Sequence, residues 1–427
     1  MWVRKRLDIG FRDFSLGALH ALLPASRATL QSRLEEDWSP SADALACFSV
    51  RTGFDLLLAT LHFPPKSEIL MSAMTIPDMA RIAEEHGLVP VPVDLDLDTL
   101  GPNLQSLRRA VTPASRAIVV AHLCGGRVPI EPILAEARQR RLWVIEDCAQ
   151  AFDGRGYTGD PDADASMFSF GPIKTATALG GAMLRVRDRG LLERMRARQA
   201  TYPVQKRRSY LCRLLKYAAF KALSYPRAYG MLVRMWRALG RDYDRLVNGS
   251  VRGFPGPDFF DRIRQQPSVP LMAVLRRRLR TYDRRRLECR AAKGELLTRL
   301  LQPKVMCAGR AAAPHNSWVF PILVEHPAEV IAALRHAGFD ATQGHSMCVI
   351  PPPADRPERA ASVAATILSG IVYLPIYPEM PDEAVRKVAE RVLAVAKRPT
   401  ESGRSSTADL PVAAPVTATA SPALRCR

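Results

Sequence analysis

The feature that most constrains the fold is a regular alternation of short apolar runs and longer amphipathic runs between Cys47 and Val186. Segments with helical spacing separate the earlier apolar runs, and they cover residues 79–87, 104–111 and 131–141. The apolar runs are typical of buried strands at 68–73, 89–95, 117–123, 142–147, 166–170 and 181–186. This alternation predicts a mostly parallel sheet that is sandwiched by helices. In such a sheet, ligands bind at the carboxyl ends of the strands.

Changes in composition divide the chain into four parts. We expect a large ligand-binding domain over residues 1–200 and a basic, apolar helical insertion over 201–250. A smaller α+β domain should follow over 251–398, with strands at 318–324 and 370–376 and helices at 327–338 and 381–397. Near the start of this domain, the sequence of residues 271–301 predicts one long basic helix. Residues 399–427 are rich in Ala, Pro, Ser and Thr, so we expect a disordered tail.

Composition excludes several classes of protein. An apolar fraction of 47% with 24% charged residues is ordinary for a globular chain and excludes collagen-like and wholly disordered classes. The cysteines form no C-x-x-C pair and the histidines have no ligand spacing, so we predict neither a metal site nor a disulfide framework. The first residues lack the pattern of a signal peptide. We expect a cytoplasmic protein, with attachment to the inner face of the membrane left open.

An acidic residue and a lysine follow two neighbouring predicted strands. Asp147 ends the strand at 142–147, and Lys174 lies just past the strand at 166–170. Both side chains should therefore project from the carboxyl edge of the sheet into one crevice. An amine and a carboxylate in one crevice are what pyridoxal 5'-phosphate chemistry requires, since the amine forms an imine and the carboxylate keeps the pyridine nitrogen protonated.

A phosphate-binding turn should precede this pair in the chain. Residues Arg51, Thr52 and Gly53 are predicted to form a turn that opens a helix. Free N–H groups and the positive end of a helix dipole at such a turn favour an anion.

At these residues the sequence resembles the DegT/DnrJ/EryC1/StrS family of pyridoxal-phosphate-dependent sugar aminotransferases, which have the aspartate aminotransferase fold (fold type I). The strand ending E-D-x-A-Q-A is present as residues 146–151, and F-S-F-x-x-x-K is present as residues 168–174. The resemblance implies that Lys174 is the Schiff-base lysine and proton carrier and that Asp147 pairs with the pyridine nitrogen. It further implies that Gln150 bonds near the cofactor 3-hydroxyl. Phosphate-binding roles are implied for Ser169, Thr52, Gly53 and Phe54.

The same resemblance implies the reaction. An amino acid, typically glutamate in this family, would donate its amino group to a keto sugar or a related carbonyl compound in a ping-pong transamination within a homodimer. Family members that act as dehydratases replace the lysine by histidine, whereas this chain keeps Lys174. The phosphate turn departs from the family pattern at Phe54, and Gly171 and Leu179 also differ. A dehydratase and a non-catalytic sensor or scaffold therefore remain as alternatives.

The insertion carries much of the excess positive charge. Of a net charge of +19, residues 201–250 contribute 11 Lys and Arg against 2 Asp. Three interpretations stay open: helices that pack on the enzyme, an amphipathic segment on an anionic membrane, and a nucleic-acid-binding segment. We predict no nucleic-acid partner, because no recognition motif accompanies the charge.

Overall fold

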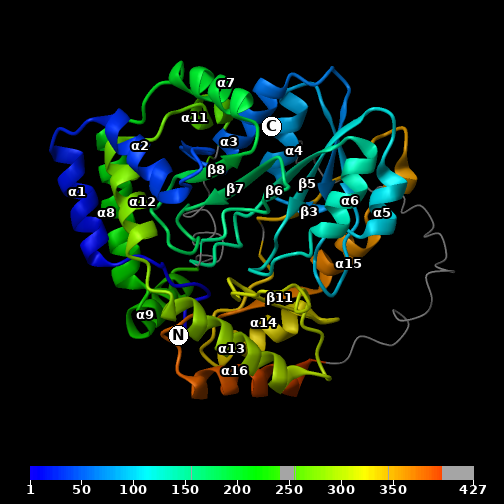
Figure 1. The fold of residues 1–427 in the computed structure, drawn as a ribbon. Coiled ribbons are helices and arrows are strands. Elements are labelled where there is room, and N and C mark those ends of the chain that lie inside the picture. The colour runs from blue at the N-terminus through cyan, green and yellow to red at the C-terminus, as the bar shows by residue number, and fades with distance from the viewer. Residues whose placement is uncertain (155, 241–253, 255, 345, 397–427) are drawn as a thin grey trace.

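A computed structural model describes residues 1–154, 156–240, 254, 256–344 and 346–396 of the chain (Figure 1). A large helix–sheet–helix body forms one end of the molecule, and a smaller unit lies below the carboxyl edge of the sheet. The tail 399–427 and the end of the insertion, 241–250, lie outside the described residues.

The central sheet has seven strands in the order β1-β8-β7-β6-β5-β2-β4. Pairs β2·β4, β2·β5, β5·β6 and β6·β7 are parallel, whereas β8 runs antiparallel to both β1 and β7. The predicted mostly parallel α/β sheet is confirmed. The strands are β1 (Ala44–Cys47), β2 (Glu68–Ser72), β4 (Val89–Val93), β5 (Ser115–Ala121), β6 (Trp143–Asp147), β7 (Ala165–Ser169) and β8 (Ala182–Val186).

Helices cover both faces of this sheet because successive strand residues point to opposite sides. Ile69 and Met71 of β2 pack in one core with α3 (Val50–Leu61), α4 (Pro77–Glu85) and α7 (Arg189–Ala200). Leu70, between them, packs in a second core with α5 (Leu104–Ala110) and α6 (Glu131–Arg140).

A further helical layer covers the other end of the second face, and the sequence pattern predicts helix in its later part but not in residues 11–38. It contains α1 (Phe11–Leu22) and α2 (Arg27–Trp38), together with α8 (Arg207–Leu223) of the insertion and α12 (Val269–Arg280). A Cβ at Gly17 of α1 would lie 2.8 Å from Leu214 and 2.9 Å from Val274, so glycine lets the three helices approach closely. The start of the insertion is thus packed on the body.

The smaller unit has its own core. Its helices are α13 (Arg285–Leu301), α14 (Pro327–His336) and α16 (Asp382–Val395), and its strands β9 (Phe320–Leu323) and β11 (Ile371–Leu374) are antiparallel. Val3 and two residues of α9 (Pro226–Ala238), Tyr229 and Val233, join this core. Short elements complete the described chain: β3 (Met74–Thr75) paired with β10 (Cys348–Val349), α11 (Phe259–Ile263), α15 (Ser362–Gly370) and a 3-10 turn at Pro357–Arg359.

The prediction of one helix over 271–301 is wrong. The segment divides into α12 and α13, with residues 281–284 between them. The Tyr282 hydroxyl donates to Asp8 Oδ2 at 2.8 Å, and Asp283 Oδ1 accepts from the Arg285 amide at 3.0 Å. These contacts engage residues between the two helices, and the first comes from the far end of the chain, so helical periodicity could not reveal them. No helix among the described residues is long and apolar enough to cross a membrane.

Candidate active site

Asp147 and Lys174 come together at the carboxyl edge of the sheet, as their positions at strand ends predict. Asp147 is the last residue of β6, and Lys174 follows β7 by five residues. The two side chains lie close enough for each charge to shift the pKa of the other.

The Lys174 side chain is half-buried, and a second cation, Arg51, lies close to it. Burial lowers its pKa from 10.5 to about 8, Asp147 opposes this change, and the guanidinium of Arg51 adds to it. The Nζ atom lies 4.4 Å from the centroid of the Trp318 ring. A lysine in this setting holds a substantial share of free amine near neutral pH, which is the nucleophilic form.

Among the described residues, the carboxyl group of Asp147 has few hydrogen-bond partners. Burial raises its pKa, while the Ala149 amide, which donates to Oδ1 at 3.0 Å, and the charge of Lys174 oppose the rise. Nearby, Gln150 Oε1 accepts from the Cys124 amide at 2.8 Å, and this bond orients the side chain beside Asp147. A cationic N–H at Asp147 would relieve the cost of burying its charge.

The helix that the predicted turn at residues 51–53 should open begins earlier than expected, at Val50. Ser49 is the N-cap of α3, and its hydroxyl accepts from the Thr52 amide at 3.1 Å. The Thr52 hydroxyl donates to the Ile263 carbonyl at 2.7 Å, and the Gly53 amide donates to the Ser49 carbonyl at 3.0 Å. Phe54 is fully buried in the core below. These contacts withdraw Thr52, Gly53 and Phe54 from the role of anion donors.

The first two positions of α3 are better placed to bind an anion. The amides of Val50 and Arg51 have no acceptor within the helix, because helical N–H groups need a carbonyl four residues earlier. The Arg51 side chain pairs with Asp78 and lies close enough to Lys174 and Asp147 to affect both pKa values. Ser169, the last residue of β7, is half-buried and has one long contact of 3.5 Å from the Gly171 amide to its Oγ. A capping serine before Val50 was the signal that could have located this turn.

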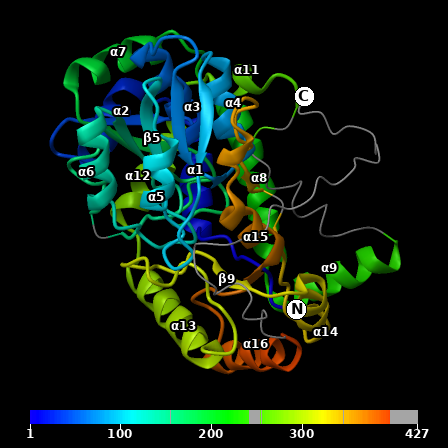
Figure 2. The same cartoon turned by 90° about the vertical axis from the view of Figure 1, so that its right-hand side faces the viewer.

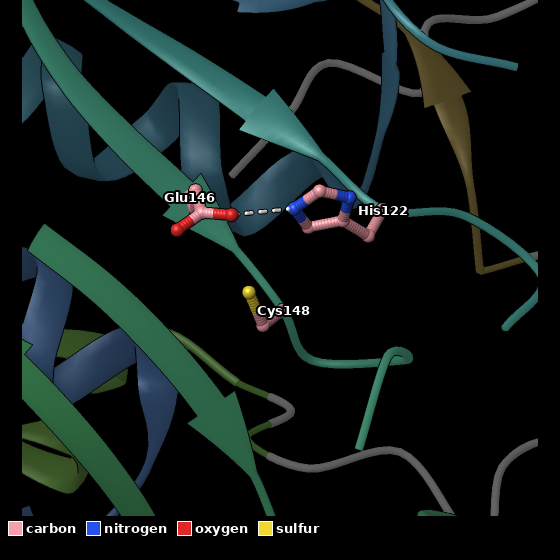
Figure 3. A group of neighbouring side chains, drawn as sticks. All are labelled: His122, Glu146 and Cys148. Atoms are coloured by element: carbon pink, nitrogen blue, oxygen red, sulfur yellow. Dashed lines mark hydrogen bonds and ion pairs between the residues drawn. The ribbon is translucent and has the colours of Figure 1, made fainter. Parts of the chain in front are cut away.

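A buried cluster of His122, Glu146 and Cys148 lies behind the site (Figure 3). His122 Nε2 lies 2.9 Å from Glu146 Oε1, and His122 Nδ1 accepts from the Val128 amide at 3.0 Å. Burial alone would raise the pKa of Glu146, but hydrogen bonds from His122, Tyr157 and Ser166 lower it to about 2. Burial raises the pKa of Cys148.

The ligand atoms of His122 and Glu146 are engaged by groups of the protein itself. Both nitrogens of His122 have partners, both oxygens of Glu146 accept hydrogen bonds, and Cys148 is held as a thiol rather than a thiolate. The cluster fixes the end of β6, from which Asp147 projects.

Two further residues at the site come from distant parts of the chain. Trp318, just before β9, donates from Nε1 to the Ile173 carbonyl at 3.1 Å and presents its ring to Lys174. Lys5 also lies on this ring, with Nζ 3.4 Å from the centroid, and it donates to the Trp318 carbonyl at 3.0 Å. Burial lowers the pKa of Lys5, and the neighbouring cations Arg290 and Lys174 lower it further. No sequence motif marks Lys5, since only its tertiary position brings it to Lys174.

Comparison with known proteins relates this chain to aminotransferases. The model of the DegT/DnrJ/EryC1/StrS aminotransferase family matches residues 34–218 and 271–393. GDP-perosamine synthase from Caulobacter vibrioides is 31% identical over 196 residues, which are 45% of this chain and 53% of that protein. The chain thus matches about half the length of this curated relative.

Solved structures share the whole fold at low identity. The aminotransferase TlmJ from Streptoalloteichus hindustanus has a TM-score of 0.67 at 18% identity, over 92% of this chain and 98% of that one. The putative sugar aminotransferase Spr1654 from Streptococcus pneumoniae, in its PMP form, has a TM-score of 0.66 at 14% identity, with the same coverages. At these identities the likeness shows the fold, which is the one that the sequence resemblance implies.

Proposed function

The chain belongs to the DegT/DnrJ/EryC1/StrS aminotransferase family, and from this premise we propose that it is a pyridoxal-phosphate-dependent aminotransferase. The observation that carries the proposal is the pairing of a half-buried lysine with a pKa of about 8 and a half-buried carboxyl group at one edge of the sheet. A non-catalytic scaffold has no need to bury these two groups together, since each costs stability.

The residues present fit the cofactor at both of its charged ends. The amides of Val50 and Arg51, the Arg51 guanidinium and the Ser169 hydroxyl would hold the phosphate group. Asp147 would accept the pyridinium N–H, and Gln150, already fixed by Cys124, would bond the ring hydroxyl. When bound, pyridoxal 5'-phosphate supplies an aldehyde for a Schiff base with Lys174 and a ring that withdraws electrons from the substrate.

Lys174 would then serve as the proton carrier. Its Nζ would take a proton from the donor α-carbon and would give one to the carbon that receives the amino group. A pKa of about 8 suits both directions, because a base works best when its pKa lies near the working pH. Asp147 would keep the ring nitrogen protonated.

We propose an amino acid, glutamate in the first instance, as donor and a keto sugar or related carbonyl compound as acceptor. The sugar assignment is supported by the printed activities of the relatives, GDP-perosamine synthase among them. We further propose a homodimer, as the family resemblance implies. Retention of Lys174 favours transamination over dehydration.

The visible absorption spectrum of the purified protein tests the proposal. We expect a visible band from bound cofactor that is bleached by glutamate and absent from Lys174→Ala. Arg51→Gln should weaken cofactor binding without abolishing the band at saturating cofactor, whereas Arg109→Gln on the exposed surface of α5 should match the wild type. A protein that stays colourless with added cofactor would refute the enzyme and leave the scaffold interpretation. A band that glutamate and other amino donors leave unchanged would exclude transamination and favour another reaction of the cofactor.

A further inference from the structure

Large apolar side chains that remain exposed gather on one part of the molecule. Of the twelve that are exposed among the described residues, eleven lie in α1, in α8 and α9, or in the few residues next to them. They are Phe11, Leu19, Leu22, Leu23, Val204, Leu215, Leu223, Tyr225, Met231, Met235 and Leu239, and only Val363 lies elsewhere. We call the exposed side of α1, α8 and α9 the flank surface.

The three helices are neighbours although α1 is remote in sequence. Helix α1 packs on α8, and α8 contacts α9. Figure 1 shows all three on the flank of the molecule opposite α5 and α6, and Figure 2 shows α9 projecting from the body. The inward sides of the helices are already used, by Phe14 and Gly17 of α1, Leu214 of α8 and Val233 of α9. The exposed side chains on the outward sides of these helices are therefore not required for packing of the core.

Positive charge is interleaved with these apolar side chains. Exposed basic residues on the flank surface are Arg12, Lys206, Arg208, Lys216, Arg227 and Arg234. Residues 201–240 contain no Asp or Glu, and the one acidic residue of α1, Asp13, is buried against Arg277 and Arg278. Arginine and lysine beside leucine and methionine, without acids, are typical of a helix that lies on an anionic bilayer.

The charge also decides between two possible occupants. A second copy related by a two-fold axis would bring the same basic residues against themselves, which repel. An anionic lipid surface instead complements the basic residues and receives the apolar ones. We propose that the flank surface binds the anionic surface of a membrane, so that the enzyme is a peripheral membrane protein. This goes beyond the aminotransferase function and does not depend on it.

Flotation of the full-length protein with lipid vesicles tests the proposal. We expect binding to vesicles of phosphatidylcholine with phosphatidylglycerol, none to pure phosphatidylcholine, and weakening by salt. Arg227→Gln with Arg234→Gln should reduce affinity about thirtyfold, because each basic residue at such a surface contributes about 1 kcal/mol. Arg109→Gln with Arg141→Gln removes the same charge from the opposite flank and should change affinity less than twofold.

A second variant tests the apolar side chains of the flank surface and distinguishes membrane binding from a dimer contact. Met231→Ser with Met235→Ser should weaken binding by about the same factor at low and high salt, since burial of apolar groups is not screened. The two charge variants and the methionine variant must all keep the wild-type melting temperature, which shows that the helices stay folded. The proposal is overturned if the wild type does not float with anionic vesicles or if the two charge variants bind alike. It is also overturned if the methionine variant dissociates a dimer in sedimentation while vesicle binding is unchanged.

Discussion

The ionisation of Lys174 can be predicted in sign and size from its neighbours. Its pKa is lowered to about 8, mainly because its side chain is half-buried and secondarily because Arg51 is close. At pH 7.5 roughly a quarter of the molecules would then hold the free amine, against roughly a thousandth for a lysine with a pKa near 10.5. The site thus raises the share of nucleophile by about two orders of magnitude.

Two substitutions should move this pKa in opposite directions. Arg51→Gln removes a cation that disfavours the ammonium, so the pKa of Lys174 should rise. Asp147→Asn removes the anion that favours the ammonium, so the pKa should fall below 8. In a partly buried site, one neighbouring charge shifts the pKa of a group by on the order of one unit.

Carbon-13 spectra of lysine-labelled protein without cofactor measure these values directly. The chain has ten lysines, and the signal that Lys174→Ala lacks is assigned to Lys174. Arg109→Gln is the matched control, because it removes an exposed charge far from the site. If Lys174 titrates near its ordinary value of 10.5, or if the two substitutions shift it in the same direction, the electrostatic account of the site is refuted.

Three other predictions concern residues around the site. Glu146→Gln should lower the free energy of unfolding in urea by about 3 kcal/mol, since the pKa of Glu146 is lowered from 4.5 to about 2. The wild type should lose the same stability as the pH falls from about 4.5 towards 2. An unchanged urea midpoint in the variant would contradict the prediction. Gly53→Ala places a Cβ 2.5 Å from Leu184 and should destabilise the protein by about 1–3 kcal/mol, part of which Leu184→Ala should restore; additive losses would exclude the clash. Lys174→Ala should raise the pKa of Lys5, because Lys174 is one of the cations that lower it, and a fixed Lys5 signal would place the two groups apart.

The sequence alone determined the frame of the site. The periodicity of residues 68–186 predicted every strand of the sheet after β1, because a buried strand and an amphipathic helix each impose a local repeat. Asp147 and Lys174 follow from the same pattern, since parallel strands present their carboxyl ends at one edge. Neither conclusion needed a contact between distant residues.

The tertiary structure decided what depends on such contacts. The division between α12 and α13 and the arrival of Lys5 at Trp318 rest on contacts across the chain. The flank surface is of the same kind, because only the packing of α1 on α8 joins their exposed residues. The start of α3 is instead set by a local cap, in which the Ser49 hydroxyl accepts from the Thr52 amide. Local patterns specify which face of an element is apolar, but the partner of that face is chosen by the fold as a whole, where long-range contacts outweigh local preference.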